Sequence, residues 1–375
     1  MTEQTTQRFV ALDVFRGMTV AFMIIVNTPG SYSKVFAPFD HALWHGFTAA
    51  DLVFPSFLFV VGAAISFVMK KWENEPTRKV LWKIIKRTII IFVLGYILMY
   101  PYSMMMKMQA GSIFPPFSET RLMGVLQRIA LTYCAASLLF YYLKPRTIVY
   151  ISIAILILYW PVLAFLGSGT DPFSLQTNAV LKLDTLLLGT GHLWIGDGFP
   201  FDPEGILSTI PAIVSVVAGA FAGKYVQTNG RTYEGLAKLF IVGFVCFIIA
   251  YFWNFGFPIN KKLWTSSFVL HTTGLTCMLL SVVIYLLDFR RINFSVYFFQ
   301  VFGRNPLVLY MFSMFCALLF MLIPFHGTSL QNWLYENIFA LAGAKLGSLL
   351  YAISFMLMCW LVGYVLDRRK IYIKV

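Results

Sequence analysis

The sequence predicts an all-α membrane protein, a polytopic bundle of about ten transmembrane helices. The chain has 375 residues, of which 59% are hydrophobic and 12% charged, whereas soluble domains have roughly 45–50% apolar and about 25% charged residues. Because roughly 20 apolar residues cross a bilayer, this length allows at most about a dozen spans with short loops. Any chemistry must therefore take place among the helices or at their mouths.

Ten apolar runs, separated by polar, basic or Pro/Gly-rich segments, are expected to be the membrane-spanning helices. In chain order they cover residues 10–28, 48–70, 80–101, 121–143, 147–166, 205–226, 234–254, 264–287, 300–323 and 346–366. The mixed segment 330–343 is expected to be an interfacial helix or a re-entrant piece.

The basic residues divide unevenly between the two sides that these spans define. With the N-terminus inside, 20 Lys and Arg residues fall on the inner side and 7 on the outer side. Cytoplasmic loops carry an excess of Lys and Arg, so both termini are predicted to be cytoplasmic. Because this topology accounts for most of the net charge of +13, no nucleic-acid partner is expected, and membrane lipid is the expected surrounding.

The long outer loop, residues 167–204, concentrates acidic side chains. It carries Asp171, Asp184, Asp197, Asp202 and Glu204, together with His192 and Trp194. This composition suits a lid or a sugar-facing surface. A solvated connector is an equally good interpretation.

Polar and ionisable side chains gather in the outer half of the predicted membrane region. A charge at the centre of a membrane helix costs several kcal/mol, so such residues are functional candidates by default. The candidates are Arg128 and His271 within spans, Asp51 and Asn254 at span ends, His41 and His45 in the first outer loop, and Lys261 just before the eighth span.

At the inner side, two arginines permit two compatible interpretations. Asp13 and Arg16 lie one helical turn apart, which favours an i,i+3 ion pair. Alternatively, Arg16 together with Arg304 and Asn305 lines a cytoplasmic cavity for an anionic ligand, because guanidinium groups suit phosphate.

Segment 40–55 is the richest in chemical possibilities. A histidine is the natural base near neutral pH, and a neighbouring carboxylate can fix its tautomer. Thr48 is expected to cap the second helix, with Asp51 at the third position of the first turn, and this structural role suits Asp51 at least as well as a catalytic one. The spacing of His41 and His45 also resembles a pair of metal ligands, but no third ligand is evident, so no metal is predicted.

Several blocks of the sequence resemble the heparan-α-glucosaminide N-acetyltransferase family of transmembrane acetyltransferases. These blocks are residues 8–17, 23–27, 41–55, 59–62, 121–130, 202–205, 208–211 and 258–265. They extend over most of the chain, and 1–375 is accordingly interpreted as a single transmembrane acyltransferase domain. The resemblance predicts a bacterial-type member in the inner membrane, without the luminal N-terminal extension of the animal enzymes.

The resemblance implies transfer of an acetyl group from cytoplasmic acetyl-CoA to the amine of a glucosamine-type sugar on the outer side. It implies that His41 is the active-site histidine, that Asn27 is a second active-site residue, and that the protein is a homodimer. His45 stands where the animal enzymes have Asn, so the question of which histidine titrates stays open. The identity of the acceptor also stays open.

The chemistry of the transfer suggests a role for each residue. A deprotonated amine attacks a thioester readily, so the enzyme must hold the reactants together, accept a proton and stabilise an oxyanion. His41 is expected to act as the base or as the nucleophile of an acetyl-imidazole, and Asn27 to donate to the thioester carbonyl. The nucleotide end of CoA is expected near Arg16 and Arg304. The alternatives are a transporter or flippase of a glycan or lipid precursor, and a membrane O-acyltransferase.

Overall fold

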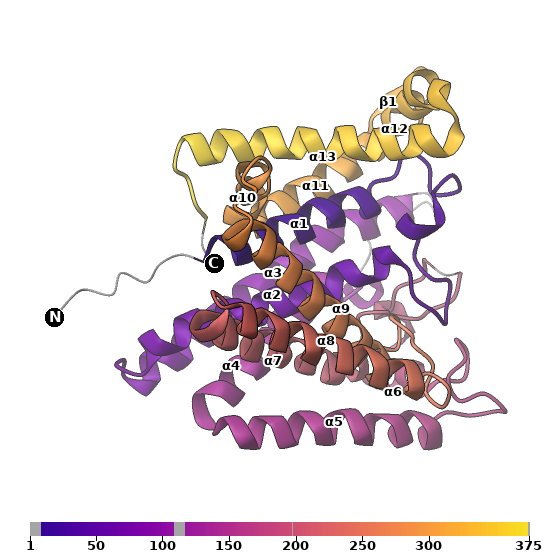
Figure 1. The fold of residues 1–375 in the computed structure, drawn as a ribbon. Helices are drawn as coiled ribbons and strands as arrows, with labels where there is room; N and C mark the ends of the chain where they lie inside the picture. The colour runs from indigo at the N-terminus through magenta and orange to yellow at the C-terminus, as the bar shows by residue number, and fades with distance from the viewer. Residues whose placement is uncertain (1–8, 109–116, 197, 374–375) are drawn as a thin grey trace. The chain divides into compact units, whose positions relative to one another are not determined.

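The computed structural model describes residues 9–108, 117–196 and 198–373, and these residues are almost entirely helical (Figure 1). The long helices are α1 (Val10–Asn27), α2 (Ala49–Trp72), α3 (Thr77–Met108), α4 (Val125–Tyr142), α5 (Pro145–Leu166), α7 (Ile206–Asn229), α8 (Tyr233–Trp253), α9 (Ser266–Ile284), α11 (Pro306–Leu322) and α13 (Ala344–Arg368). Shorter helices are α6 (Ala179–Leu188), α10 (Val296–Arg304) and α12 (Leu330–Leu334). Short helical turns and one small hairpin complete the described structure: η1 (Ala37–Phe39), η2 (Phe117–Glu119), η3 (Thr190–His192), η4 (Tyr285–Phe289), η5 (Tyr335–Phe339), η6 (Ala340–Ala342), β1 (Pro324–Phe325) and β2 (Thr328–Ser329).

Length and composition identify the helices that can cross a membrane. Within the described residues, seven helices are long and apolar enough, or eight if α10 and α11 form one bent span. The prediction of an all-α, multi-pass membrane bundle is therefore confirmed. The count of ten and the side on which the termini lie stay predictions, since α3 and α4 fall outside this set.

The predicted ninth span, 300–323, is wrong as a continuous helix. The chain bends by 84° between α10 and α11, and Asn305 at the junction leaves helical geometry, with φ −129° and ψ 52°. Pro306 follows as the first residue of α11. Proline lacks a backbone N–H and is well placed at a helix start, so it breaks the apolar run into two helices.

Contacts divide the chain into two compact units. The first unit comprises the described parts of Met1–Asp40, Lys224–Gly243 and Thr276–Lys374, and the second comprises His41–Gly223 and Phe244–Leu275. Helices α7, α8 and α9 contribute residues to both units.

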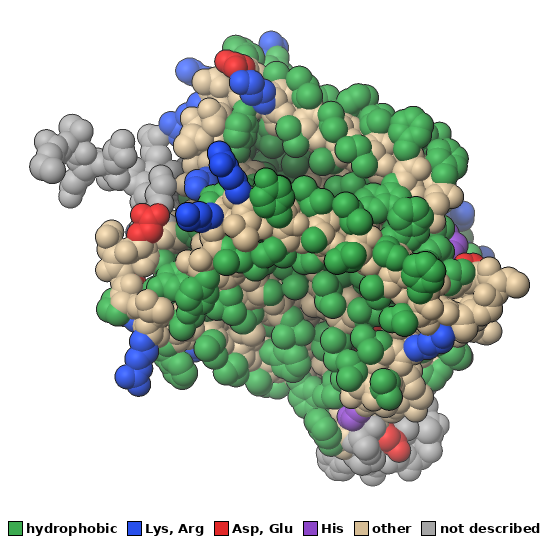
Figure 2. All heavy atoms as spheres, turned by 90° about the horizontal axis from the view of Figure 1, so that it is seen from below, with side chains coloured by type: hydrophobic (Ala, Val, Ile, Leu, Met, Phe, Trp, Pro, Cys, Tyr) green, Lys and Arg blue, Asp and Glu red, His purple; other side chains and the backbone are tan. Residues whose placement is uncertain are grey.

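The helices differ in how much of their surface the protein encloses. About 67% of the apolar stretch of α2 and 72% of that of α7 is buried, against 22% for α5 and 28% for α8. The exposed apolar side chains of α5 and α8 are suited to contact lipid. The face drawn in Figure 2 is accordingly dominated by hydrophobic side chains, with Lys and Arg in small groups toward its margins.

Helices α2 and α7 approach each other closely through glycines. A Cβ atom on Gly62 of α2 would lie 1.8 Å from the carbonyl oxygen of Val216, and one on Gly219 of α7 would lie 1.9 Å from that of Phe59. Small residues at such crossings let membrane helices pack backbone to backbone. This contact fixes α2, whose first turn carries the candidate site.

Candidate active site

The candidate site is built around His41 and the first turn of α2. The Nδ1 atom of His41 lies 2.8 Å from Oδ1 of Asp51, and because a carboxylate only accepts, Nδ1 carries the proton. The second oxygen of Asp51 accepts from the backbone N–H groups of Ala42 and Thr48, each at 3.1 Å. The predicted capping box of Thr48 and Asp51 is therefore confirmed, and the same carboxylate also orients the histidine.

The exposure of the two side chains suits a base held by a buried carboxylate. The His41 side chain is 40% exposed, whereas that of Asp51 is 1% exposed. A substrate can therefore reach the imidazole, while its partner is shielded from water. A carboxylate in this position fixes the tautomer and stabilises the imidazolium that forms when the ring accepts a proton.

Lys261 lies against the same pair. Its Nζ atom is 3.1 Å from Nδ1 and 3.3 Å from Nε2 of His41, and 3.4 Å from Oδ1 of Asp51. The structure thus brings together three of the predicted site residues from segments that are far apart in sequence. Burial lowers the pKa of the Lys261 ammonium, and the carboxylates of Asp51 and Glu204 oppose that shift.

His45 occupies a separate position on the loop that precedes α2. Its Nδ1 atom lies 3.4 Å from Nδ2 of Asn260, and its ring packs edge-on against Trp44. Burial lowers the pKa of His45, and the carboxylate of Asp171 opposes this shift. Trp44 anchors this loop by donating its Nε1–H to the carbonyl oxygen of Phe173 at 2.8 Å.

A buried ionic cluster lies in the same unit. Arg121 donates to both carboxylate oxygens of Asp202, at 2.8 Å and 2.7 Å, and to Glu204 at 2.6 Å. Its guanidinium also lies over the ring of Trp194. The sequence did not single out Arg121 as a site residue, since its acidic partners lie 81 and 83 positions away; the only signal was its place in one of the family-like blocks.

Arg128 is completely buried next to this cluster. One of its terminal nitrogens donates to the hydroxyl of Ser208 and to the carbonyl of Gly205, and the guanidinium lies 4.8 Å from the ring centre of Trp264. Its Nε and Nη1 atoms have no hydrogen-bond partner among the described residues. Arg128 therefore braces the start of α7 against the turn that carries Lys261.

The acidic loop 167–204 is not a purely solvated connector, because several of its carboxyl groups are buried. Asp184 and Asp202 are each about 1% exposed, and Asp184 accepts hydrogen bonds from the backbone N–H groups of Ile206 and Leu207 at the start of α7. Burial raises the pKa of Asp184 to about 6. Asp171 is exposed, and Asp197 lies outside the described residues.

Two further predicted candidates, Asn254 and His271, contact residues outside the His41–Asp51 pair. Asn254 accepts from the backbone N–H of Ile259 at 2.8 Å and so closes the turn after α8. His271 on α9 lies between the rings of Phe47 and Phe247, with ring centres 4.5 Å and 4.8 Å away. Aromatic packing is therefore the contact that the structure gives this histidine.

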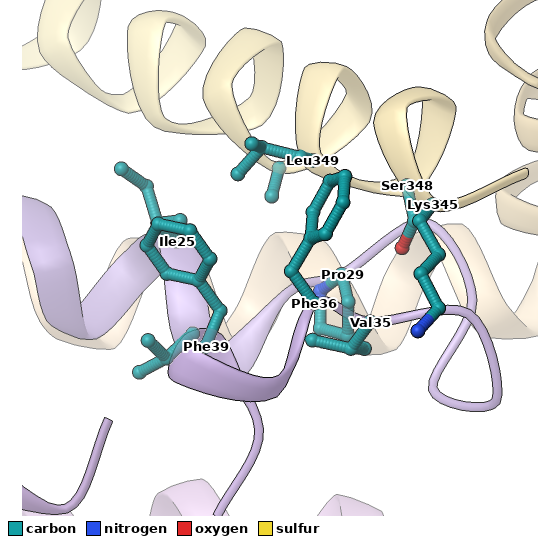
Figure 3. A pocket seen from close by; sticks show the side chains of 10 residues that line it. Ile25, Pro29, Val35, Phe36, Phe39, Lys345, Ser348 and Leu349 are labelled. Carbon is teal, nitrogen blue, oxygen red and sulfur yellow. The ribbon is translucent and has the colours of Figure 1, made fainter. Parts of the chain in front are cut away.

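Asn27 ends α1 in the first unit, whereas His41 belongs to the second. The carbonyl of Asn27 accepts from the hydroxyl of Tyr32 at 3.0 Å. The loop that follows is tied to α13, because Ser348 binds the backbone of Gly30 and Ser31. A small pocket lies beside this loop (Figure 3), with an apolar lining except for Lys345 and Ser348; the remaining lining residues are Ile25, Val26, Pro29, Val35, Phe36, Phe39, Leu349 and Ala352.

The predicted CoA-binding residues also lie in the first unit. Arg16 pairs with Asp13, as the i,i+3 spacing predicted. Arg304 donates to both oxygens of Asp367, at 2.6 Å and 2.7 Å. The side chain of Asn305 bonds the backbone of Ile371 and Ile373 near the C-terminus.

The described side chains of the site provide acid–base chemistry. No group of three His, Cys, Asp or Glu residues within the described ranges is arranged to hold a metal ion. The His41–Asp51 pair can take up and release a proton, and the exposed ring can reach a bound amine. This arrangement suits acyl transfer to a nucleophile that must lose a proton.

Comparisons with known proteins identify one family and two mammalian relatives. Residues 8–216 match the family described as a domain of unknown function, DUF5009, a range that includes both members of the His41–Asp51 pair. The chain is also 28% identical over 359 residues to heparan-alpha-glucosaminide N-acetyltransferase of Mus musculus, which covers 82% of this chain and 53% of the mouse protein.

The human protein of the same name gives a similar result. It is 28% identical over 427 residues, which covers 98% of this chain and 60% of the human protein. The chain therefore spans between half and two thirds of the length of these mammalian relatives. The family relationship expected from the sequence is confirmed as a distant one.

Proposed function

The chain belongs to the family described as a domain of unknown function, DUF5009, and from its distant kinship to the mammalian N-acetyltransferases we propose that it is a membrane acetyltransferase. The acetyl group passes from acetyl-CoA to the amine of a glucosamine-type sugar. The observation that carries this proposal is the His41–Asp51 pair, an accessible imidazole held by a buried carboxylate.

In the proposed reaction, His41 removes the proton that the acceptor amine loses as it attacks the thioester. The amine nitrogen forms a bond to the acetyl carbon, the carbon–sulfur bond breaks, and CoA leaves as a thiolate that is then protonated. Asp51 stabilises the imidazolium formed on the way. An acetyl group carried briefly on His41 uses the same two residues, because Asp51 holds the ring through Nδ1. We further propose that Asn27 donates to the thioester carbonyl.

The donor side of the proposal rests on the basic residues of the first unit. We propose that the phosphates of CoA bind near Arg16, Arg304 and Asn305, from the cytoplasmic side. Arg304 already donates to Asp367 through one terminal nitrogen and to Gln300 through the other, so an anion would have to displace one of these acceptors or bind at Nε. Guanidinium groups suit such contacts because they present several N–H donors in one plane.

We propose that the chain acts as a single acyltransferase domain, as a homodimer in a bacterial inner membrane, with both termini cytoplasmic and the acceptor outside. His45, Arg128, Asn254, Lys261 and His271 are proposed to support the acceptor side. Their contacts suggest different contributions: Lys261 touches the imidazole, whereas His271 packs between aromatic rings.

The test uses purified protein in proteoliposomes with radiolabelled acetyl-CoA and glucosamine. The proposal predicts a labelled product that is stable to mild base, as an amide is and an ester is not. An ester product would instead identify a membrane O-acyltransferase. Uptake of the sugar into sealed vesicles without any acetyl donor, and without labelled product, would identify a transporter and contradict the proposal.

A further inference from the structure

The turn between α2 and α3, together with the first turns of α3, carries a high density of positive charge. Residues 70–87 contain seven Lys and Arg residues against two acidic ones, Glu73 and Glu75. Membrane topology alone accounts for an excess of basic residues on the inner side. It does not determine which of these cations are engaged within the protein and which face outward.

Two of the cations are engaged within the protein. The ammonium of Lys83 donates to a carboxylate oxygen of Glu75 at 2.6 Å. The guanidinium of Arg87 lies 4.6 Å from the ring centre of Tyr133 on α4, which is a cation–π contact. These two side chains therefore stabilise the hairpin of α2 and α3 itself.

Two other cations, Arg78 and Lys79, line an open groove of about 940 Å³ at the start of α3. Both side chains are exposed. Trp82 and Ile85 lie one and two turns further along the helix and form the apolar part of the groove. The indole of Trp82 is 62% exposed. The groove thus combines two outward-facing cations with an exposed aromatic surface.

Contacts on the opposite face of α3 fix the orientation of the groove. Val80 and Ile84 are fully buried, and residues four positions apart lie on the same face of a helix. The hydroxyl of Tyr141 on α4 donates to the hydroxyl of Thr77 at 2.9 Å. The helix therefore cannot turn Trp82 inward without exposing the two buried aliphatic side chains.

The groove lies at one end of an apolar stripe on α3. Ile89, Val93 and Ile97 continue the exposed face beyond Ile85. Residues 88–106 contain no charged side chain, and at a rise of 1.5 Å per residue they extend over about 28 Å. This length matches the roughly 30 Å hydrocarbon core of a bilayer. With α3 spanning the membrane, as the sequence predicts, the groove lies at the level of the lipid headgroups.

From this arrangement we propose that the groove binds an anionic phospholipid, with Arg78 and Lys79 on the phosphate of its headgroup and an acyl chain along the stripe that begins at Ile85. Guanidinium and ammonium groups form charge-assisted hydrogen bonds with phosphate oxygens. Indole side chains such as that of Trp82 favour the boundary between headgroups and acyl chains. A soluble anion would use the two cations alone, whereas a phospholipid also covers the apolar part of the groove.

The test measures the binding of single phospholipids to the purified full-length protein by native mass spectrometry. Phosphatidylglycerol is compared with phosphatidylcholine that has the same acyl chains. The wild type should bind phosphatidylglycerol more tightly. The double variant Arg78→Gln/Lys79→Gln should weaken that binding by about 30-fold and leave phosphatidylcholine binding unchanged. Arg290→Gln/Arg291→Gln is the matched control, because it removes two exposed adjacent cations on the same predicted side.

A second measurement needs no variant and does not depend on acetyl transfer. In proteoliposomes, phosphatidylglycerol with a photoreactive headgroup should label peptides from residues 76–87. Equal binding of the two phospholipids by the wild type, an equal loss of binding in the control variant, or labelling confined to other segments would overturn the inference. Displacement of the label by coenzyme A would show that the groove holds a soluble nucleotide, and it would overturn the inference as well.

Discussion

Replacing Asp184 with asparagine should make the protein less sensitive to rising pH. The Asp184 carboxyl is 1% exposed, and only Oδ1 is bonded, to the N–H groups of Ile206 and Leu207. Its other oxygen is buried without a partner among the described residues. An asparagine keeps the bonded oxygen and removes the buried negative charge.

The magnitude follows from the pKa of Asp184, which burial raises from 3.8 to about 6. Each pKa unit corresponds to 1.36 kcal/mol, so the shift corresponds to about 3 kcal/mol. Because the folded pKa is raised, the folded state holds the proton more tightly than the unfolded state. This contribution to stability is complete below about pH 4 and is lost as the pH rises through about 6.

The assay is unfolding in mild detergent, with wild type and Asp184→Asn compared at several values between about pH 4 and about pH 7.5. The variant should gain up to about 3 kcal/mol relative to wild type across this range. Asp171→Asn is the control, because it makes the same change at an exposed carboxylate of the same loop. A difference between wild type and Asp184→Asn that does not vary with pH would refute the reasoning.

Three other predictions concern packing and charge. Arg121→Met should lower the free energy of unfolding by about 3–5 kcal/mol, because it leaves buried carboxylates uncompensated. Adding Asp202→Asn should restore part of the lost stability. Thermal unfolding of the single and the double variant measures both effects. Gly62→Val should prevent α2 from packing, since even a Cβ would lie 1.8 Å from the Val216 carbonyl oxygen; size-exclusion chromatography should show little folded protein. His271→Phe should fold and keep most acetyl-transfer activity, because the ring packs between aromatic side chains. A loss of activity as large as that of His41→Ala would show that the imidazole of His271 takes part in the reaction.

The helices and local pairs could be predicted from the sequence because their signals are local. Apolar runs locate most of the long helices to within a few residues, although α3 extends to Met108 and α11 begins only at Pro306. The spacing of Asp13 and Arg16 predicts their ion pair. The capping box at the start of α2 could also be predicted, since Thr48 and Asp51 are three positions apart. The break at Asn305 was missed because an apolar run does not distinguish one helix from two joined at a proline.

The site contacts could not be predicted because they join distant segments. Lys261 touches His41 across 220 positions, and Arg121 reaches Asp202 across 81. Hydropathy places such residues at the same side of the membrane but does not tell which of them meet. The acidic residues of loop 167–204 are an example. Their composition alone does not show that Asp202 is buried against Arg121.

The most direct test of the account compares acetyl transfer by wild type, His41→Ala and His45→Ala in proteoliposomes. Loss of the base should slow transfer by at least about 100-fold in His41→Ala, with much less effect in His45→Ala, and His326→Ala serves as an exposed-histidine control. Transfer at the wild-type rate by His41→Ala, with the fold intact, would contradict the central claim that this imidazole accepts the proton.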